Sequence, residues 1–332
     1  RIWGSMSTGG SQGVRGSHDY VRKAGAAARE MLVAAAAARW KVAPAECSVD
    51  KGVITHGPTK RRLRYGQVAA QAAKLEPPKQ IALRDPKDWK IAGKPLHRLD
   101  IPDKVLGKPV FGTDVMLPGL LHASIAQCPV FGGKVRGVDS AEAMTMRGVK
   151  QVVRAGDFVA VVADSWWRAN EALKKVKVDW DTGDHGAASD ATVMAMLREG
   201  LADPKAVSAK KSGDAAAALA TAAKVVEAEY SSPYLNHATM EPQVCTAWVK
   251  PDGFVEVWTS TQNGEASLAA AAETAGVPQE KAEVHKMMLG GGFGRRGAPQ
   301  DFVKQGVTIA KAVAGKPVKL MWSREEDMQH GF

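Results

Sequence analysis

Met288-Leu289-Gly290-Gly291-Gly292-Phe293-Gly294-Arg295-Arg296-Gly297 is the stretch of sequence that limits the possible folds most strongly. Glycine destabilises the interior of helices and strands, so a cluster of glycines indicates tight turning or a ligand close to the main chain. Residues 282–288 before it alternate in polarity, and residues 301–310 behind it have the apolar spacing of a helix. The sequence therefore predicts a strand-to-helix connection whose backbone N–H groups and two arginines suit a phosphate or another oxyanion.

A second glycine-rich loop lies near the start of the chain, at residues 7–17. It contains Gly10 and Ser11, and the alanine-rich segment behind it predicts a helix over residues 21–40. Backbone N–H groups and a hydroxyl in front of a helix are typical of an anion site. An ordinary flexible loop explains the same composition equally well, so both interpretations stay open.

Length and composition indicate a globular protein of two or three domains. The chain has 332 residues, 45% of them hydrophobic, and no apolar run reaches the roughly 20 residues that a membrane helix needs. It begins at Arg1 and ends at Phe332 without recognisable terminal signals, so we expect a piece of a longer protein. Its three cysteines, Cys47, Cys128 and Cys245, form no CxxC pair, which argues against an iron–sulfur or zinc site built from them.

The net charge of +10 is concentrated at one end of the sequence. Residues 1–100 hold 19 lysines and arginines against 8 acidic residues. The densest run, Lys60-Arg61-Arg62-Leu63-Arg64, contains no aromatic residue and matches no zinc-finger, helix-turn-helix or RNA-recognition pattern. We therefore expect no nucleic-acid partner and favour a solvated hairpin edge, with a surface for a partner subunit as the alternative.

Alternating and helical apolar patterns together predict an α+β fold. The proline-rich residues 76–95 and the weakly hydrophobic stretch after residue 183 suggest boundaries that divide the chain into residues 1–93, 94–186 and 187–332. The predicted strands are residues 52–56, 61–65, 120–126, 149–154, 158–163, 175–180, 224–230, 244–250, 254–259, 282–288 and 318–322. The further predicted helices are residues 67–75, 165–174, 214–223, 265–275 and 301–310, and residues 324–327 are predicted to form a solvated turn.

Residues 292–297 also fit the pattern GxGxxG, with Glu325 near the position of a ribose-binding acid. This pattern would suit an NAD(P)-dependent Rossmann oxidoreductase. However, the strand before it carries Glu283, His285 and Lys286, whereas a central parallel strand is almost continuously apolar. The dinucleotide interpretation is therefore kept as an alternative.

His237 and Glu241 are the other pair with possible chemistry, either as metal ligands or as an acid–base pair. A histidine that is hydrogen-bonded at a turn explains the same residues more simply. We favour that structural interpretation.

Six motifs, taken in order, resemble the molybdenum-binding large subunit of the xanthine dehydrogenase/aldehyde oxidase family. They are Ser7-Thr8-Gly9-Gly10-Ser11, Arg98-x-Asp100, Lys104-x-x-Gly107, Asn236-His237-x-x-Met240-Glu241-Pro242, Thr261-Gln262 and Gly290-Gly291-Gly292-Phe293-Gly294. Within the family, the early Thr-Gly-Gly-Ser segment and Arg295-Arg296 are most similar to the isoquinoline 1-oxidoreductase beta-subunit branch. The resemblance covers essentially the whole chain.

The resemblance implies a hammerhead-like α/β module at residues 94–186, flanked by parts of molybdopterin-binding domains at residues 1–93 and 187–332. It implies that Gln262 lies beside an oxo ligand of molybdenum, where a neutral amide donor adds no charge. The glycine loop would contact the oxygen and dithiolene surroundings of the metal. The expected cofactor-binding residues are Gln262, Gly291, Gly292, Phe293, Gly294, Arg295, Arg296, Gly10 and Ser11.

The resemblance also implies a molybdenum hydroxylase that oxidises an aldehyde or an N-heteroaromatic substrate with oxygen derived from water. The cofactor would be a molybdenum-molybdopterin dinucleotide in its cytosine form. Electrons would pass to iron–sulfur clusters on a small partner subunit, and a cytochrome c could accept them further on. The resemblance points to the periplasm, with the cytoplasm as the alternative location.

Two departures limit what the resemblance assigns. The family's catalytic glutamate belongs to a C-terminal part beyond residue 332, so no catalytic residue is assigned and the chain alone is expected to be inactive. Gly297 stands where the xanthine dehydrogenase branch often has an acid, so purine-type substrate contacts are not expected. A non-catalytic basic binding module remains a further alternative, based on the charge of residues 1–100.

Overall fold

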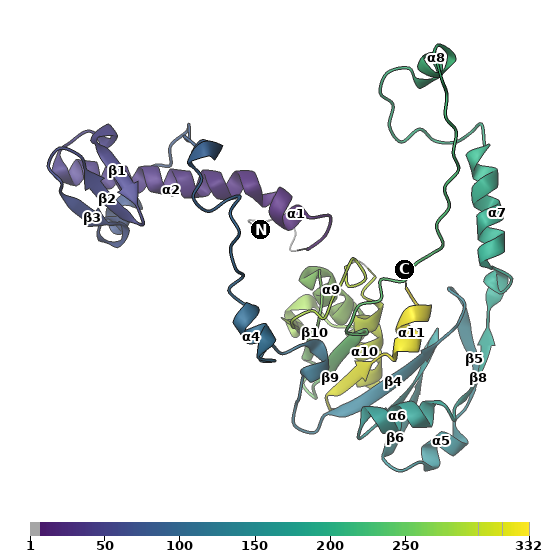
Figure 1. Cartoon of the computed structure of the whole chain (residues 1–332). Coiled ribbons are helices and arrows are strands. Elements are labelled where there is room, and N and C mark those ends of the chain that lie inside the picture. Colours follow the sequence, from purple (N-terminus) through teal and green to yellow (C-terminus); the bar gives the residue numbers. More distant parts are fainter. Residues whose placement is uncertain (1–6, 298, 314, 332) are drawn as a thin grey trace. The chain divides into compact units, whose positions relative to one another are not determined.

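The computed structural model describes residues 7–297, 299–313 and 315–331, and these form two compact units (Figure 1). The smaller unit is Thr8–Lys108. The larger unit contains Ser7 and the described residues from Pro109 onward. Each unit is described separately below. In the described part of the chain, no helix combines the length and apolar character needed to cross a membrane.

The smaller unit is built on one long helix and a small antiparallel sheet in the order β1-β2-β3. Its core joins Ala35 and Ala36 of the long helix to Ile54 and Leu63 of the sheet. Alanine on the buried helix face allows close approach to the strands, which explains why an alanine-rich segment forms this interface. The elements are α1 (Gln12–Arg15), α2 (Ser17–Trp40), β1 (Cys47–Asp50), β2 (Val53–His56), β3 (Arg62–Arg64), α3 (Ala69–Ala72) and α4 (Ile101–Val105).

The larger unit is organised around a mixed seven-stranded sheet in the order β11-β10-β9-β12-β4-β7-β6, with β5 and β8 paired separately. Its strands are β4 (Leu121–Gln127), β5 (Lys134–Asp139), β6 (Val149–Arg154), β7 (Phe158–Ala163), β8 (Lys177–Asp181), β9 (Val244–Val249), β10 (Val255–Thr259), β11 (Ala282–Lys286) and β12 (Val318–Met321). Its helices are α5 (Ala141–Thr145), α6 (Trp166–Leu173), α7 (Asp190–Leu201), α8 (Ala215–Ala220), α9 (Gly264–Ala275), α10 (Asp301–Ala312) and α11 (Arg324–Gln329).

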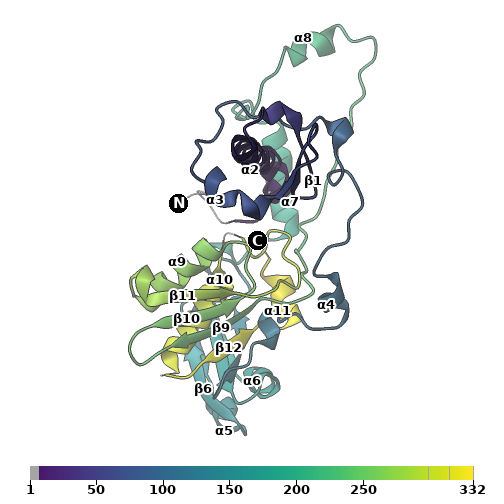
Figure 2. The same ribbon diagram turned by 90° about the vertical axis from the view of Figure 1, so that its left-hand side faces the viewer.

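Helices cover both faces of the large sheet, as the alternation along β7 shows. Ala160 and Val162 belong to the main core, which also contains residues of α9 and α10. Val161 points to the opposite face, where it packs with Ala143 of α5 and Ala172 of α6. Figures 1 and 2 show α9 and α10 beside β9–β11. A strand buried on both faces is expected to be apolar throughout, and all six residues of β7 are buried.

Most predicted elements are confirmed, with shifts of at most four residues at their ends, and the overall α+β class is confirmed. The hairpin of β9 and β10 turns at residues 251–253, and α9 ends at Gly276 with a φ of 78°. The sequence missed β1 and β5. It also suggested a boundary at residues 186/187, whereas the large sheet combines strands from both sides of that point, with β12 parallel to β4.

Two local predictions are wrong. Residues 224–230 form no strand, because no strand among the described residues pairs with them and their side chains are exposed. Residues 324–327 do not form a solvated turn but begin the helix α11. Ser323 caps α11 by accepting a hydrogen bond from the Glu326 N–H, and Asp327 is buried. The sequence did not reveal this helix, because its residues are mostly charged. The buried Asp327 carboxylate is tolerated because it accepts hydrogen bonds from Gln243 and Arg324.

Substitution of Gly306 tests how closely α10 packs against the sheet. A Cβ atom at this position would lie 2.7 Å from Cys245 Sγ and 2.9 Å from Cys245 Cβ on β9. We expect Gly306→Ala to reduce the free energy of unfolding by about 1–3 kcal/mol through overpacking, despite the better helix propensity of alanine. Urea unfolding followed by circular dichroism measures the change.

Gly200→Ala in α7 is the matched control, because no atom lies within 4 Å of its Cβ position. It should leave the urea midpoint unchanged or raise it. Equal effects of the two substitutions would contradict the packing of α10 described above.

Candidate functional site at the glycine-rich loop

The candidate site is formed where two neighbouring parallel strands end. β10 and β11 run parallel, with Thr259 opposite Lys286 at their carboxyl ends. The chain continues from β10 to Gln262 and from β11 to the glycine-rich loop at residues 290–297, so both features leave the sheet at the same edge. Ser7 forms an isolated antiparallel bridge with Asn263, beside Gln262. The sheet thus brings together segments that are far apart in the sequence.

Gln262 holds the glycine loop through its side chain and its backbone. Its Oε1 atom accepts a hydrogen bond of 3.0 Å from the Gly294 N–H, and its own N–H donates to the Arg296 carbonyl oxygen at 3.0 Å. A Cβ atom on Gly292 would lie only 2.6 Å from Gln262 Oε1. Position 292 therefore requires glycine for this contact, and the contact turns the Gln262 amide so that its NH2 group is the donor end.

The outer surface of the loop consists of main chain and one aromatic ring. Phe293 has a φ of 56°, an unfavourable conformation for a bulky residue, and 76% of it is exposed. Gly291 and Gly294 flank it with φ values of 103° and 111°. Such strain persists only where the surroundings impose it, and it is concentrated at functional sites. The loop presents a surface that a flat ligand can approach closely.

Arg296 lies beneath the loop and is fully buried. Its guanidinium donates to the carbonyl oxygens of Gly291, Ser260 and Glu241 at 3.0, 3.3 and 2.6 Å. It also lies 3.2 Å from a carboxylate oxygen of Glu241. Burial lowers the pKa of the Arg296 guanidinium, and the Glu241 carboxylate opposes this shift. Arg296 therefore stabilises the loop from inside.

Arg295 is also buried and points into the protein. It forms a bidentate ion pair with Asp301, at 2.9 and 2.7 Å, and its guanidinium lies over the Trp322 ring. Sequence reasoning expected both arginines to offer their charge to an anion. In this structure both guanidiniums are engaged by carboxylates and carbonyl oxygens of the chain.

Glu241 is the buried acid that joins the loop to the rest of the unit. One carboxylate oxygen accepts from the Thr113 N–H at 3.1 Å, and the other accepts from the Gly290 N–H at 3.1 Å. A Cβ atom on Gly290 would lie 2.4 Å from the Glu241 Cβ, so this contact also requires glycine. The sequence considered Glu241 only as a partner of His237. The motif that contains Glu241 could have suggested its structural role, but its spacing from His237 alone could not.

His237 lies on the outer side of the loop. Its Nε2 atom is 3.5 Å from the Cβ position of Gly294, and its buried Nδ1 has no hydrogen-bond partner among the residues that the structure describes. The favoured interpretation, a histidine hydrogen-bonded at a turn, therefore gains no support at Nδ1 and stays a prediction. The His237 ring instead lies beside the Gln262–Gly294 contact.

Sequence reasoning missed a buried polar network behind the loop. Ser267 Oγ of α9 donates to Gln300 Oε1 at 2.5 Å and lies within hydrogen-bond distance, 2.9 Å, of the Thr261 hydroxyl. Gln300 donates in turn to the Gly297 carbonyl oxygen at 2.8 Å. Gln300 has a φ of 51° and is 2% exposed. The periodicity of the sequence does not reveal such residues. They form hydrogen bonds with each other and with the loop backbone, whereas periodicity reports the buried face of a helix or strand.

Gly10 and Ser11, which the sequence also predicted to bind the cofactor, belong to the smaller unit. Both have positive φ values, 53° and 57°, and both are exposed. The Gln12 N–H donates to the Gly9 carbonyl oxygen, which closes a tight turn in front of α1. Their role as cofactor ligands stays a prediction.

Glu241→Gln tests the buried pair beneath the loop. The amide keeps the size of the side chain but leaves the Arg296 charge uncompensated in the interior. We expect the free energy of unfolding to fall by about 3 kcal/mol. The matched control is Asp179→Asn, which removes the carboxylate of an exposed bidentate pair with Arg136 at 2.7 Å and should change stability little. If Glu241→Gln reduced the free energy of unfolding as little as Asp179→Asn does, the Glu241 carboxylate would not be needed to compensate the buried charge of Arg296.

Residues 200–331 match the family described as "Molybdopterin cofactor-binding domain". The chain is 30% identical to the isoquinoline 1-oxidoreductase subunit beta of Brevundimonas diminuta, over 98% of this chain and 47% of that protein. It is 31% identical to a membrane-bound aldehyde dehydrogenase [pyrroloquinoline-quinone] of Gluconacetobacter polyoxogenes, over 98% of this chain and 44% of that protein. The chain thus spans just under half the length of these two relatives.

The fold is also shared with a solved oxidoreductase. Quinoline 2-oxidoreductase from Pseudomonas putida 86 superposes with a TM-score of 0.55 and 19% identity, covering 70% of this chain and 34% of that one. The chain belongs to the xanthine dehydrogenase/aldehyde oxidase family of molybdenum-binding large subunits, and is similar to its isoquinoline 1-oxidoreductase beta-subunit branch.

Proposed function

We propose that this chain is part of the large subunit of a molybdenum hydroxylase that oxidises an aldehyde or an N-heteroaromatic compound with oxygen derived from water. The observation that carries the proposal is the contact between Gln262 Oε1 and the Gly294 N–H, since it joins the two motifs that the family resemblance assigns to the cofactor. The names of the two relatives refer to an isoquinoline and an aldehyde, which supports these substrate classes.

The residues at the loop fit a molybdopterin cofactor. Glycine is required at positions 290 and 292 by contacts of 2.4 and 2.6 Å, so the loop carries no side chain there that would hold a ligand away from the main chain. The Gln262 amide supplies a neutral donor, and the buried arginines keep the loop in place without offering a bare charge to a metal centre. A bound molybdenum cofactor would supply the two-electron oxidation chemistry.

The chain's own contribution would be binding and orientation. Gln262 would direct its NH2 group at the cofactor, because its Oε1 is held by Gly294. The exposed Phe293 ring would cover apolar surface beside the site and exclude water from it. His237 Nδ1, buried without a hydrogen-bond partner among the described residues, would be satisfied by a ligand group or an ordered water beside the loop.

The remaining assignments are extensions of this proposal. The cofactor would be the cytosine dinucleotide form, and electrons would leave through iron–sulfur clusters on a small partner subunit toward a cytochrome c. Residues 94–186 would be the hammerhead-like module, and residues 1–93 and 187–332 parts of molybdopterin-binding domains. The catalytic base would come from outside the 332 residues, and the location would be periplasmic.

The dinucleotide-binding alternative is not supported by the fold. A Rossmann domain has a mostly parallel, doubly wound sheet, whereas here β9 lies antiparallel to both of its neighbours and β11 is an edge strand. Three residues separate Gly297, the last glycine of the pattern, from Asp301, where α10 begins, so the glycines do not lead directly into a helix N-terminus. A non-catalytic basic module would leave the glycine contacts at Gln262 unexplained.

Gly292→Ala in the full-length, assembled enzyme tests the role of the Gln262 contact. The added methyl group would displace the Gln262 amide, and a displacement of this kind is expected to reduce turnover of an aldehyde or N-heteroaromatic substrate about 100-fold. Molybdenum content should be measured in parallel, so that loss of cofactor is separated from loss of orientation. Gly156→Ala is the control, since no atom lies within 4 Å of its Cβ position. Full turnover in Gly292→Ala would contradict the proposal.

A second test uses the 332-residue chain without any partner. It should show no dye-linked oxidation of aldehydes, because the proposed base and the electron-transfer clusters lie elsewhere. Restoration of activity by the full-length subunits assembled with cofactor is the positive control. Measurable turnover by the isolated chain would require a catalytic base among its own residues and would overturn the assignment.

A further inference from the structure

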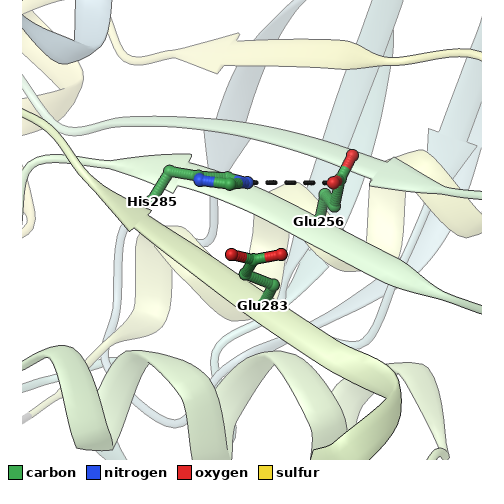
Figure 3. Close-up of side chains that lie close together, drawn as sticks. All are labelled: Glu256, Glu283 and His285. Carbon is green, nitrogen blue, oxygen red and sulfur yellow. Dashed lines mark ion pairs between the residues drawn. The ribbon is translucent and has the colours of Figure 1, made fainter.

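A cluster of metal-binding side chains lies on the open face of the β10–β11 pair, away from the glycine loop. Glu256 of β10 is directly opposite Glu283 of β11, and Trp258 is opposite His285 two positions further on. Side chains two residues apart on a strand share a face, so all four lie on the same side of the sheet. Figure 3 shows His285, Glu256 and Glu283 gathered on this side of the two strands.

The imidazole of His285 is held in place by its neighbours. Its ring stacks on Trp258 with 4.7 Å between the ring centres and an angle of 17° between the planes. Its Nε2 atom is buried and has no hydrogen-bond partner in the described part of the chain. Glu256 Oε1 is 3.8 Å away, which is too far for a hydrogen bond.

The two carboxylates complete the arrangement. Lys250 Nζ lies 3.0 Å from Glu256 Oε2 and over the Trp248 ring, so it holds one oxygen of Glu256 while the other faces His285. One ligand atom from each of Glu256, Glu283 and His285 lies within 4.8 Å of the others. Two ligands bound to the same zinc ion at tetrahedral geometry are about 3.4 Å apart. The separation of 3.8 Å between His285 and Glu256 is therefore close to that of two ligands sharing an ion.

We propose that His285 Nε2, Glu256 Oε1 and a Glu283 carboxylate oxygen form a site for one divalent transition-metal ion of the Zn²⁺ type. An imidazole with two carboxylates is a ligand set that suits zinc, and water would complete the coordination. Glu283 is exposed and gives the ion a path from solvent. The site joins the edge strand β11 to β10, the two strands that lead to the glycine loop and to Gln262. Its role is structural: it clamps these strands together and takes no part in the oxidation.

Titration of the chelator-free 332-residue chain with zinc chloride, followed by calorimetry, tests the site. One Zn²⁺ per chain should bind saturably and raise the melting temperature, because a ligand that binds only the folded state stabilises it. His285→Gln and Glu283→Gln should each weaken zinc binding at least tenfold and remove the thermal shift. His185→Gln and Glu280→Gln, two exposed residues outside the cluster, are matched controls and should bind zinc as the unmodified chain does.

Two outcomes would overturn the proposal. One is the absence of saturable zinc binding by the unmodified chain at millimolar zinc. The other is zinc binding that survives both His285→Gln and Glu283→Gln, which would place the ion elsewhere. Circular dichroism of each variant shows whether it is folded, and the ¹⁵N shift of His285 Nε2 on zinc addition to the unmodified chain reports coordination without any substitution.

Discussion

The buried ion pair between Arg296 and Glu241 is the interaction on which the rest of the candidate site depends. Arg296 is fully buried, Glu241 is 7% exposed, and their side chains approach to 3.2 Å. Such a pair is tolerated only when its remaining donors and acceptors are also satisfied. Here the guanidinium also bonds to carbonyl oxygens of Gly291, Ser260 and Glu241, and the carboxylate accepts from two backbone N–H groups.

This pairing explains how a sequence with so many glycines adopts one conformation. Glycine-rich loops lose much conformational entropy when they become ordered, and they need contacts that offset the loss. The Arg296 guanidinium and the Glu241 carboxylate tie down residues 290 and 291, and Gln262 ties down residue 294. The outer surface of the loop is thereby left to its main chain and to Phe293. The buried charges of Arg296 and Glu241 therefore fix the shape of the loop, whose outer surface has mainly uncharged groups.

The sequence predicted much of the fold, because apolar periodicity reports which faces of an element are buried. The hairpin of β9 and β10, helix α10 and the long helix α2 all followed from that pattern. The apolar periodicity does not determine which strands pair with each other in a sheet. The parallel pairing of β12 with β4 joins residues about two hundred positions apart, and it places strands from both sides of the suggested boundary at 186/187 in one sheet. The segment at 224–230 has the composition of a strand but lacks a described partner.

The site was predictable as a set of motifs but not as a set of contacts. The order of motifs identified Gln262 and the glycine loop, and the structure brings them within a hydrogen bond of each other. It did not tell which way Arg295 and Arg296 point, since side-chain direction depends on acids supplied by Asp301 and by Glu241, which come from other segments. Nor did it reveal the network of Ser267, Thr261 and Gln300, which satisfies loop backbone groups.

We propose that the loop at residues 290–294 and the Gln262 amide form one wall of a molybdopterin site. A crystal structure of the full-length enzyme with its cofactor bound tests this most directly. We expect the Gln262 side chain and the main chain of residues 292–294 to contact the cofactor. A cofactor bound elsewhere, or a prosthetic group of another kind such as a quinone with no molybdenum present, would contradict it.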